Sequence, residues 1–120
     1  MRYMMLIYSK EMPEGPSPEE RAQIMAGHVT VMRAAKEKGV FEGAEALTPS
    51  TTATTVRVQG EKVLLTDGPF AETKEQLAGY YILDCANLDE AIEWAARIPT
   101  GCKGREGCIE IRALPGLPKM

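Results

Sequence analysis

The sequence contains few of the residues from which metal and cofactor sites are built. Its 120 residues include three cysteines and one histidine. Cys102 and Cys108 lack the paired spacing of a zinc site, and a single histidine cannot form the histidine pair that many metal sites use. A Ser-His-Asp order, a Walker loop and a dinucleotide-binding glycine fingerprint are missing as well. We therefore expect neither a metal nor a cofactor.

A long hydrophobic run and an excess of basic residues are also absent. No apolar stretch approaches the ~20 residues of a membrane-spanning helix, and the apolar N-terminal segment is too short for a cleavable signal sequence. With an odd number of cysteines, a reducing cytoplasm is the expected location, with no membrane partner. The formal net charge of −3 and the scattered basic residues argue against direct nucleic-acid binding, which needs a basic stripe.

What is present is the composition of one small globular domain. Hydrophobic residues make up 44% of the chain and charged residues 26%, which are ordinary values. The length is that of a single domain. Residues 1–114 are predicted to form it, and the Pro- and Gly-rich residues 115–120 are predicted to be a loose tail.

Hydrophobic periodicity predicts strands and helices in alternation. A helix is expected over residues 18–38, with Ser17 as its cap and Gly39 as its end, and a second helix is expected between Asn87 and Pro99. Two predicted strands are apolar on both faces, two alternate between apolar and polar residues, and one returns from a turn to complete a hairpin. The five expected strands cover residues 3–8, 51–58, 62–66, 77–84 and 109–113.

This order is the split βαβ pattern of an α+β, ferredoxin-like fold, with the strand over 62–66 as an extra hairpin strand. The pattern places the strands over 3–8 and 77–84, which are the two that are apolar on both faces, in the middle of the sheet. Both helices then cover one face, which leaves the other face apolar at its centre. A second copy packed face to face would bury this surface, so a homodimer is expected.

His28 is the first candidate for chemistry. It falls within the apolar arc of the first helix, one turn from Ile24 and from Met32, and so it should point toward the sheet. One interpretation is a core-edge histidine that bonds a backbone carbonyl. The other is a general acid or base, since an imidazole titrates near neutrality and needs only a carboxylate to orient it.

The segment Asp67-Gly68-Pro69-Phe70 is a strong turn signal. We expect Gly68 to adopt a positive φ and Phe70 to bury its ring, and Gly68→Val should cost about 1–3 kcal/mol through strain. Residues 71–75 then form a polar cluster, which is either a solvated loop or the mouth of a pocket.

Two further features could line a binding site. Tyr80 and Tyr81 are consecutive in a predicted strand, so one phenol should face the helices and the other the dimer cavity. The glycine-rich loop over residues 101–107 contains Lys103 and Arg105, so it could bind an anion, although it lacks the spacing of a phosphate-binding loop.

Residues 66–81, TDGPFAETKEQLAGYY, resemble the signature of the DGPF branch of the YCII-related family. Residues 45–47, 52–57 and 88–96 resemble its flanking blocks, and Ala78 stands where the family usually has a second glycine. The resemblance implies the dimeric α/β-barrel version of the ferredoxin-like fold. It also implies an active-site pocket with a histidine and an aspartate, and His28 lies at the place of the YCII histidine. One relative dehalogenates a chlorinated hydroquinone.

These observations predict a small-molecule enzyme or binder, with a pocket between sheet and helix near the dimer interface. His28 is the expected general base, and Asp67 or Glu72 is the expected carboxylate that orients it. Lys74 and Tyr80 are further candidates for the pocket. DGPF proteins are often encoded beside extracytoplasmic-function sigma factors, so a non-enzymatic accessory role to a sigma factor is the alternative. An oxygenase-like barrel is a third possibility, and one histidine permits haem ligation without indicating it.

Overall fold

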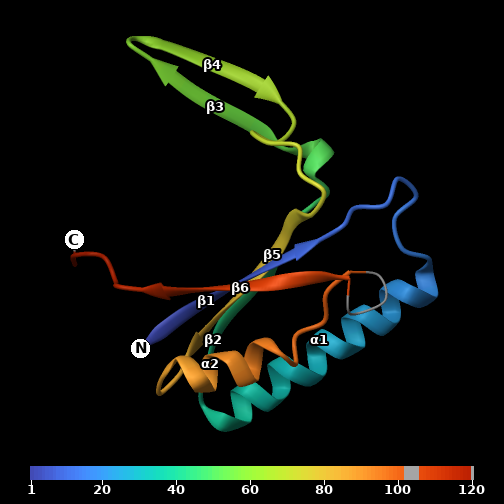
Figure 1. Cartoon of the computed structure of the whole chain (residues 1–120), viewed down its shortest axis with the longest axis vertical. Helices are drawn as coiled ribbons and strands as arrows, with labels where there is room; N and C mark the ends of the chain where they lie inside the picture. Colours follow the sequence, from blue (N-terminus) through green and yellow to red (C-terminus); the bar gives the residue numbers. More distant parts are fainter. Residues whose placement is uncertain (102–105, 120) are drawn as a thin grey trace.

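A four-stranded antiparallel sheet with two helices on one face forms the body of the protein (Figure 1). The computed structural model describes residues 1–101 and 106–119. The sheet order is β2-β5-β1-β6, and β3 pairs with β4 in a separate two-stranded sheet. The elements are β1 (Arg2–Ser9), α1 (Pro18–Lys38), β2 (Phe41–Ala46), a short 3-10 helix η1 (Ser50–Thr52), β3 (Thr54–Gln59), β4 (Lys62–Asp67), β5 (Gln76–Asp84), α2 (Leu88–Ala95) and β6 (Gly107–Leu114).

The arrangement is α+β and is compatible with a ferredoxin-like fold. The two strands that are apolar on both faces, β1 and β5, lie in the middle of the sheet, as the sequence predicts. No helix in the described part of the chain is both long enough and apolar enough to span a membrane. Residues 115–119 contain no helix or strand.

The second strand of the sheet is not the one that the sequence pattern predicts. We expected residues 51–58 to fill this place and residues 62–66 to add to it, but β2 occupies it and pairs with β5. The prediction was wrong because the segment Phe41–Ala46 has no β-branched residue and therefore a weak strand propensity. Its strand conformation comes from backbone pairing with a strand that is distant in sequence.

Local capping explains the bounds of α1. The Ser17 hydroxyl accepts a hydrogen bond from the Glu20 N–H at 3.1 Å, and the Glu20 carboxylate accepts one from the Ser17 N–H at 3.0 Å. Gly39 ends the helix with φ of 80°. The predicted helix over residues 18–38 is thus confirmed. The second helix also begins at its predicted Asn87 cap but ends at Ala95, before Pro99.

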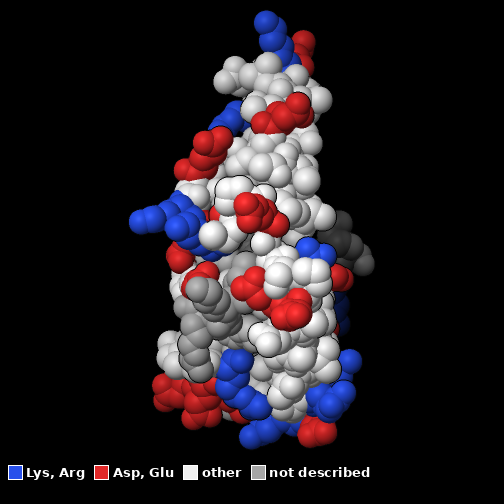
Figure 2. Space-filling model, turned by 90° about the vertical axis from the view of Figure 1, so that its right-hand side faces the viewer, with Lys and Arg blue, Asp and Glu red and all other residues white. Residues whose placement is uncertain are grey.

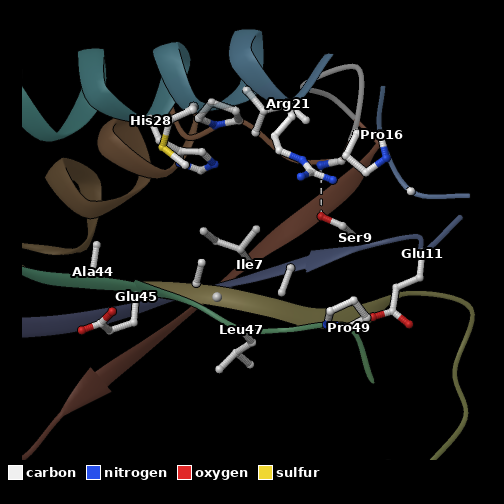
Figure 3. Close-up of a pocket in the computed structure, with 18 of the residues that line it drawn as sticks. Ile7, Ser9, Glu11, Pro16, Arg21, His28, Ala44, Glu45, Leu47 and Pro49 are labelled. Atoms are coloured by element: carbon white, nitrogen blue, oxygen red, sulfur yellow. Dashed lines mark hydrogen bonds between the residues drawn. The ribbon is translucent and has the colours of Figure 1, made fainter. Parts of the chain in front are cut away.

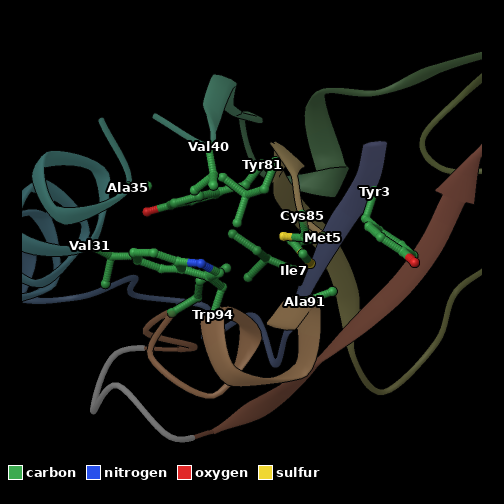
Figure 4. Close-up of a cluster of buried hydrophobic side chains, with 12 residues drawn as sticks. Tyr3, Met5, Ile7, Val31, Ala35, Val40, Tyr81, Cys85, Ala91 and Trp94 are labelled. Atoms are coloured by element: carbon green, nitrogen blue, oxygen red, sulfur yellow. The ribbon is translucent and has the colours of Figure 1, made fainter. Parts of the chain in front are cut away.

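The hydrophobic core lies between the helices and the inner face of the sheet (Figure 4). Alternate residues of β1 face it, and Met5 and Leu83 are fully buried there. The buried core residues are Tyr3, Met5, Ile7, Val31, Ala35, Val40, Tyr81, Leu83, Cys85, Ala91, Trp94 and Ile98.

The opposite face of the sheet, which we call the open face, is also apolar at its centre. Its centre contains residues of the two central strands that are only half-buried in the single chain. These residues are Met4, Leu6, Tyr8, Tyr80 and Ile82. Both helices lie on the inner face, so neither covers the open face (Figure 1).

β3 and β4 form an arm that stands away from the body (Figure 1). The radius of gyration is 16.2 Å, against about 14 Å for a compact chain of this length. The pairs Val56–Leu65 and Val58–Val63 place four apolar side chains on one face of the arm, and each is between 57% and 68% exposed. We call these four residues the apolar face of the arm. Uncharged residues, white in Figure 2, make up much of the arm's surface in that view.

The turn after β4 has one of its two predicted features. Gly68 has a φ of 100°, as predicted, and its N–H donates to the Ala53 carbonyl at 2.6 Å. The Thr55 hydroxyl donates to the Gly68 carbonyl at 2.8 Å. The predicted burial of Phe70 is wrong for the single chain, where its ring is 80% exposed. The turn joins the base of the arm to the body, and there the ring is left exposed to solvent.

Replacing Gly68 by Val should lower the free energy of unfolding by about 1–3 kcal/mol, because a branched side chain is strained at this φ. Gly43→Val in β2 is the matched control, since a side chain at either glycine would meet nothing within 4 Å and only Gly68 has a positive φ. Chemical denaturation of both variants measures the difference. Equal stability of the two would show that Gly68 is not needed for its backbone conformation.

Candidate active-site cavity

A cavity of about 650 Å³ lies between α1 and the inner face of the sheet (Figure 3). This volume is in the usual range for sites that bind small organic molecules. Ile24, Met25 and Met32 of α1 form one apolar wall. The opposite wall comes from the sheet, with Ile7, Ala44, Ala78, Gly79 and Tyr81.

His28 lies on the wall that α1 contributes, and its partner is a tyrosine of the central strand. The distance between His28 Nδ1 and the Tyr81 hydroxyl oxygen is 2.7 Å. The same hydroxyl lies 3.5 Å from the backbone carbonyl oxygen of His28. The helix places the imidazole and β5 places the phenol, so the contact joins the two layers and fixes the orientation of the ring.

Burial shifts the pKa values of both groups away from neutrality. It lowers the pKa of His28 below its ordinary 6.5 and raises the pKa of Tyr81 to about 12. At pH 7 the imidazole is therefore neutral and the phenol keeps its proton. The pair carries no net charge in the resting state.

The second ring nitrogen of His28 is available to a ligand. Among the described residues, every buried side-chain nitrogen or oxygen has a hydrogen-bond partner. Nδ1 bonds Tyr81, and Nε2 has no protein partner in the same part of the chain, so Nε2 is not sealed from solvent, and His28 belongs to the cavity lining. A half-buried imidazole with one nitrogen held and the other open is the geometry of a general acid or base.

The Tyr81 hydroxyl can serve either protonation state of the imidazole. When Nδ1–H donates to the phenol oxygen, the O–H can turn toward the His28 carbonyl, and Nε2 keeps a free lone pair. When Nε2 also gains a proton, the same Nδ1–H bond remains. In the other neutral tautomer, the O–H donates to Nδ1 and Nε2–H faces the cavity as a donor.

Charged residues gather at one end of the cavity, where Lys10, Glu11 and Arg21 belong to the lining. Glu11 is already engaged: its carboxylate accepts from the Ser50 N–H at 2.7 Å and also from the Ser50 hydroxyl. This contact ties the loop over residues 10–16 to η1, across the rim of the cavity.

Comparison with known proteins supports the resemblance to the YCII-related family. A profile of the YCII-related domain matches residues 1–114. The chain belongs to the YCII-related family. An uncharacterised protein of Rhizobium meliloti (strain 1021) is 38% identical over 115 residues, which are 95% of this chain and 92% of that protein. Since that relative is itself uncharacterised, family membership identifies the type of domain. The reaction of the domain has to be derived from the geometry of the site.

Among the predicted site residues of this YCII-related protein, only His28 lines the cavity. Asp67 is the last residue of β4, and Glu72 and Lys74 are exposed in the loop that precedes β5. Tyr80 lies on the open face, opposite Tyr81. One chain therefore does not bring these four residues to His28, and their roles in a site stay predictions.

The partner of His28 is the feature that sequence analysis missed. We expected a carboxylate, and the structure has the hydroxyl of Tyr81 instead. The alternation of β5 contained the signal, because one of two consecutive tyrosines had to face the helices. Tyr81 is that residue, and it is 2% exposed.

The potential metal-binding side chains form no metal site within the part of this YCII-related chain that the structure describes. No group of three His, Cys, Asp or Glu residues lies close enough there to hold a metal ion. Cys85 is buried and Cys108 is exposed, and both are free thiols. Cys102 and the predicted anion-binding residues Lys103 and Arg105 lie outside the described residues.

Proposed function

We propose that this YCII-related protein binds a small organic molecule in the cavity and moves a proton on it through Nε2 of His28. The observation that supports this function is the His28–Tyr81 pair on the cavity wall, with Nδ1 2.7 Å from the phenol oxygen. The rest of the wall is largely apolar, so bound ligand would displace water from around the imidazole. A neutral base in such a site needs no metal to act at pH 7.

The proton-transfer step has a simple balance. An acidic O–H bond of the ligand breaks, or a C–H bond beside a carbonyl group. The proton forms a new bond with Nε2 of His28, and the bonding electrons stay on the ligand. Nδ1–H meanwhile donates to the Tyr81 oxygen, which stabilises the imidazolium. Because burial lowers the pKa of His28, the imidazolium readily returns the proton to the ligand or to water.

The single histidine makes this proposal directly testable. With ¹⁵N-labelled histidine, NMR reports the tautomer and protonation of His28 alone. We expect phenols, quinols or carbonyl compounds from a screen to shift the Nε2 signal, and a subset of them to be turned over. If no compound in the screen shifts the signal or reacts, the cavity is not a site for this chemistry.

We further propose that the protein is a homodimer of the DGPF branch, with the dimeric α/β-barrel form of the ferredoxin-like fold. The single chain leaves two apolar surfaces uncovered, the open face and the apolar face of the arm. An isolated two-stranded hairpin is only marginally stable in water, so the arm needs a surface to pack against. A second copy supplies one, and it would place Asp67 and Phe70 near the interface.

Replacing Val58 and Leu65 together by Lys should weaken dimerisation at least tenfold, because both side chains belong to the apolar face of the arm. Analytical ultracentrifugation across micromolar concentrations measures the equilibrium. Gln59→Lys is the control, since Gln59 lies on the other face of the same hairpin. A wild-type chain that sediments as a monomer at these concentrations would contradict the dimer.

An accessory role beside a sigma factor, implied by resemblance alone, would require only an exposed surface. A titratable pair that faces a cavity of about 650 Å³ favours a small molecule as the partner. A cytoplasmic location remains a prediction from the sequence.

A further inference from the structure

The cavity side of α1 carries a cation at one end and the imidazole at the other. Arg21 and His28 are seven residues apart, about two helical turns, so both project from one face about 10 Å apart along the axis. Figure 3 shows the two side chains extending from this face toward the sheet. Ile24 and Met25 lie between them on the helix and also line the cavity. The order along the wall is therefore a charge, an apolar stretch and a proton-transfer group.

Arg21 has no carboxylate partner in the described part of the chain. The ion pairs there involve Arg2, Arg112 and the N-terminus, and neither Arg21 nor Lys10 takes part in one. Of the two acidic residues in the lining, Glu11 is engaged by Ser50, and Glu45 extends away from α1 in Figure 3. Within the described residues, neither cation forms an ion pair, and the Glu11 carboxylate, which keeps its charge in its bonds to Ser50, can offset only one of the two positive charges.

We infer that the ligand is a small monocarboxylate with an apolar body. Its carboxylate would bind Arg21, with Lys10 adding positive charge, because the planar guanidinium forms paired hydrogen bonds with a carboxylate. The apolar body would lie along Ile24 and Met25. This inference rests on the proposed function for the reacting end, which would lie at Nε2 of His28.

The charge preference can be measured without knowing the natural ligand. Benzoate, phenylacetate and hexanoate are each titrated against their own uncharged amides, with binding followed by calorimetry or by ligand-observed NMR. We expect at least one acid to bind about tenfold more tightly than its amide, which is the scale of a hydrogen-bonded ion pair. Salt should reduce this preference, since Arg21 is exposed to solvent.

The variant that decides the inference is Arg21→Gln, which keeps most of the side-chain length and removes the charge. It should abolish the preference for acid over amide and leave the affinity for the amide within about twofold. Arg33→Gln is the matched control, because Arg33 is an exposed arginine of the same helix outside the cavity lining. It should keep the preference.

Three results would overturn the inference: no binding by any acid, equal affinities of every acid and its amide, or an unchanged preference in Arg21→Gln. Binding of amides without preference would refute the carboxylate and leave proton transfer at His28 standing. An Arg21-dependent preference in a protein that turns over no ligand would refute proton transfer and leave the carboxylate site standing.

Discussion

Replacing His28 by Gln should lower the rate of proton transfer by about two to four orders of magnitude while the fold remains intact. Gln keeps a similar size and can still hydrogen-bond the Tyr81 hydroxyl, but it cannot accept the ligand's proton. The loss should fall on kcat, since the apolar wall and Arg21 that hold the ligand are unchanged. Steady-state kinetics on a substrate from the screen measures the effect.

The pH dependence gives this prediction a second measurement. The base is active when neutral, and burial lowers its pKa below 6.5. The wild-type rate should therefore be constant through neutral pH and should fall only as the pH drops below 6.5, toward the lowered pKa. His28→Gln should lack this acidic limb. Arg33→Gln serves as the control and should keep both the rate and the profile. Full activity of His28→Gln would exclude the base role.

Local signals made α1 predictable, whereas the place of β2 in the sheet depends on pairing between residues that are distant in sequence. Ser17, Glu20 and Gly39 define the helix within a few residues of its ends, so the sequence contains its bounds. β2 has no such signal, because its strand state depends on β5, which follows about thirty residues later. The hairpin over β3 and β4 was correctly predicted as a hairpin, but its separation from the main sheet was not.

The same distinction between local signals and non-local contacts applies to the residues of the candidate site. His28 could be found because it is the only histidine of the sequence and falls within the apolar arc of one helix, which is a property of a single element. Its partner comes from another element, and the prediction of a carboxylate followed residue type, whereas Tyr81 is determined by the register of β5 under α1. Arg21 was also missed. Its spacing of seven residues from His28, which places both on one face of the helix, was the available signal, and the loop over residues 10–16 completes this end of the cavity.

Tyr81→Phe should remove the largest tyrosine contribution to the alkaline unfolding of this protein. The pKa of Tyr81 is about 12 in the folded chain against 10.0 in the unfolded chain. Below pH 10 both states keep the proton. Between pH 10 and pH 12 the unfolded chain loses it and the folded chain retains it, so stability falls as the pH rises. Two pKa units correspond to about 2–3 kcal/mol.

Urea denaturation at pH 8 and near pH 12 measures this effect as a difference between variant and wild type, in which other titrating groups cancel. At pH 8, Tyr81→Phe should be less stable by about 1 kcal/mol, because His28 Nδ1 loses its partner. Near pH 12 it should be the more stable of the two. Tyr8→Phe is the control, since Tyr8 is far more exposed and should retain most of the wild-type loss. An alkaline loss in Tyr81→Phe as large as in wild type would mean that the Tyr81 phenol is not held in its protonated state against His28.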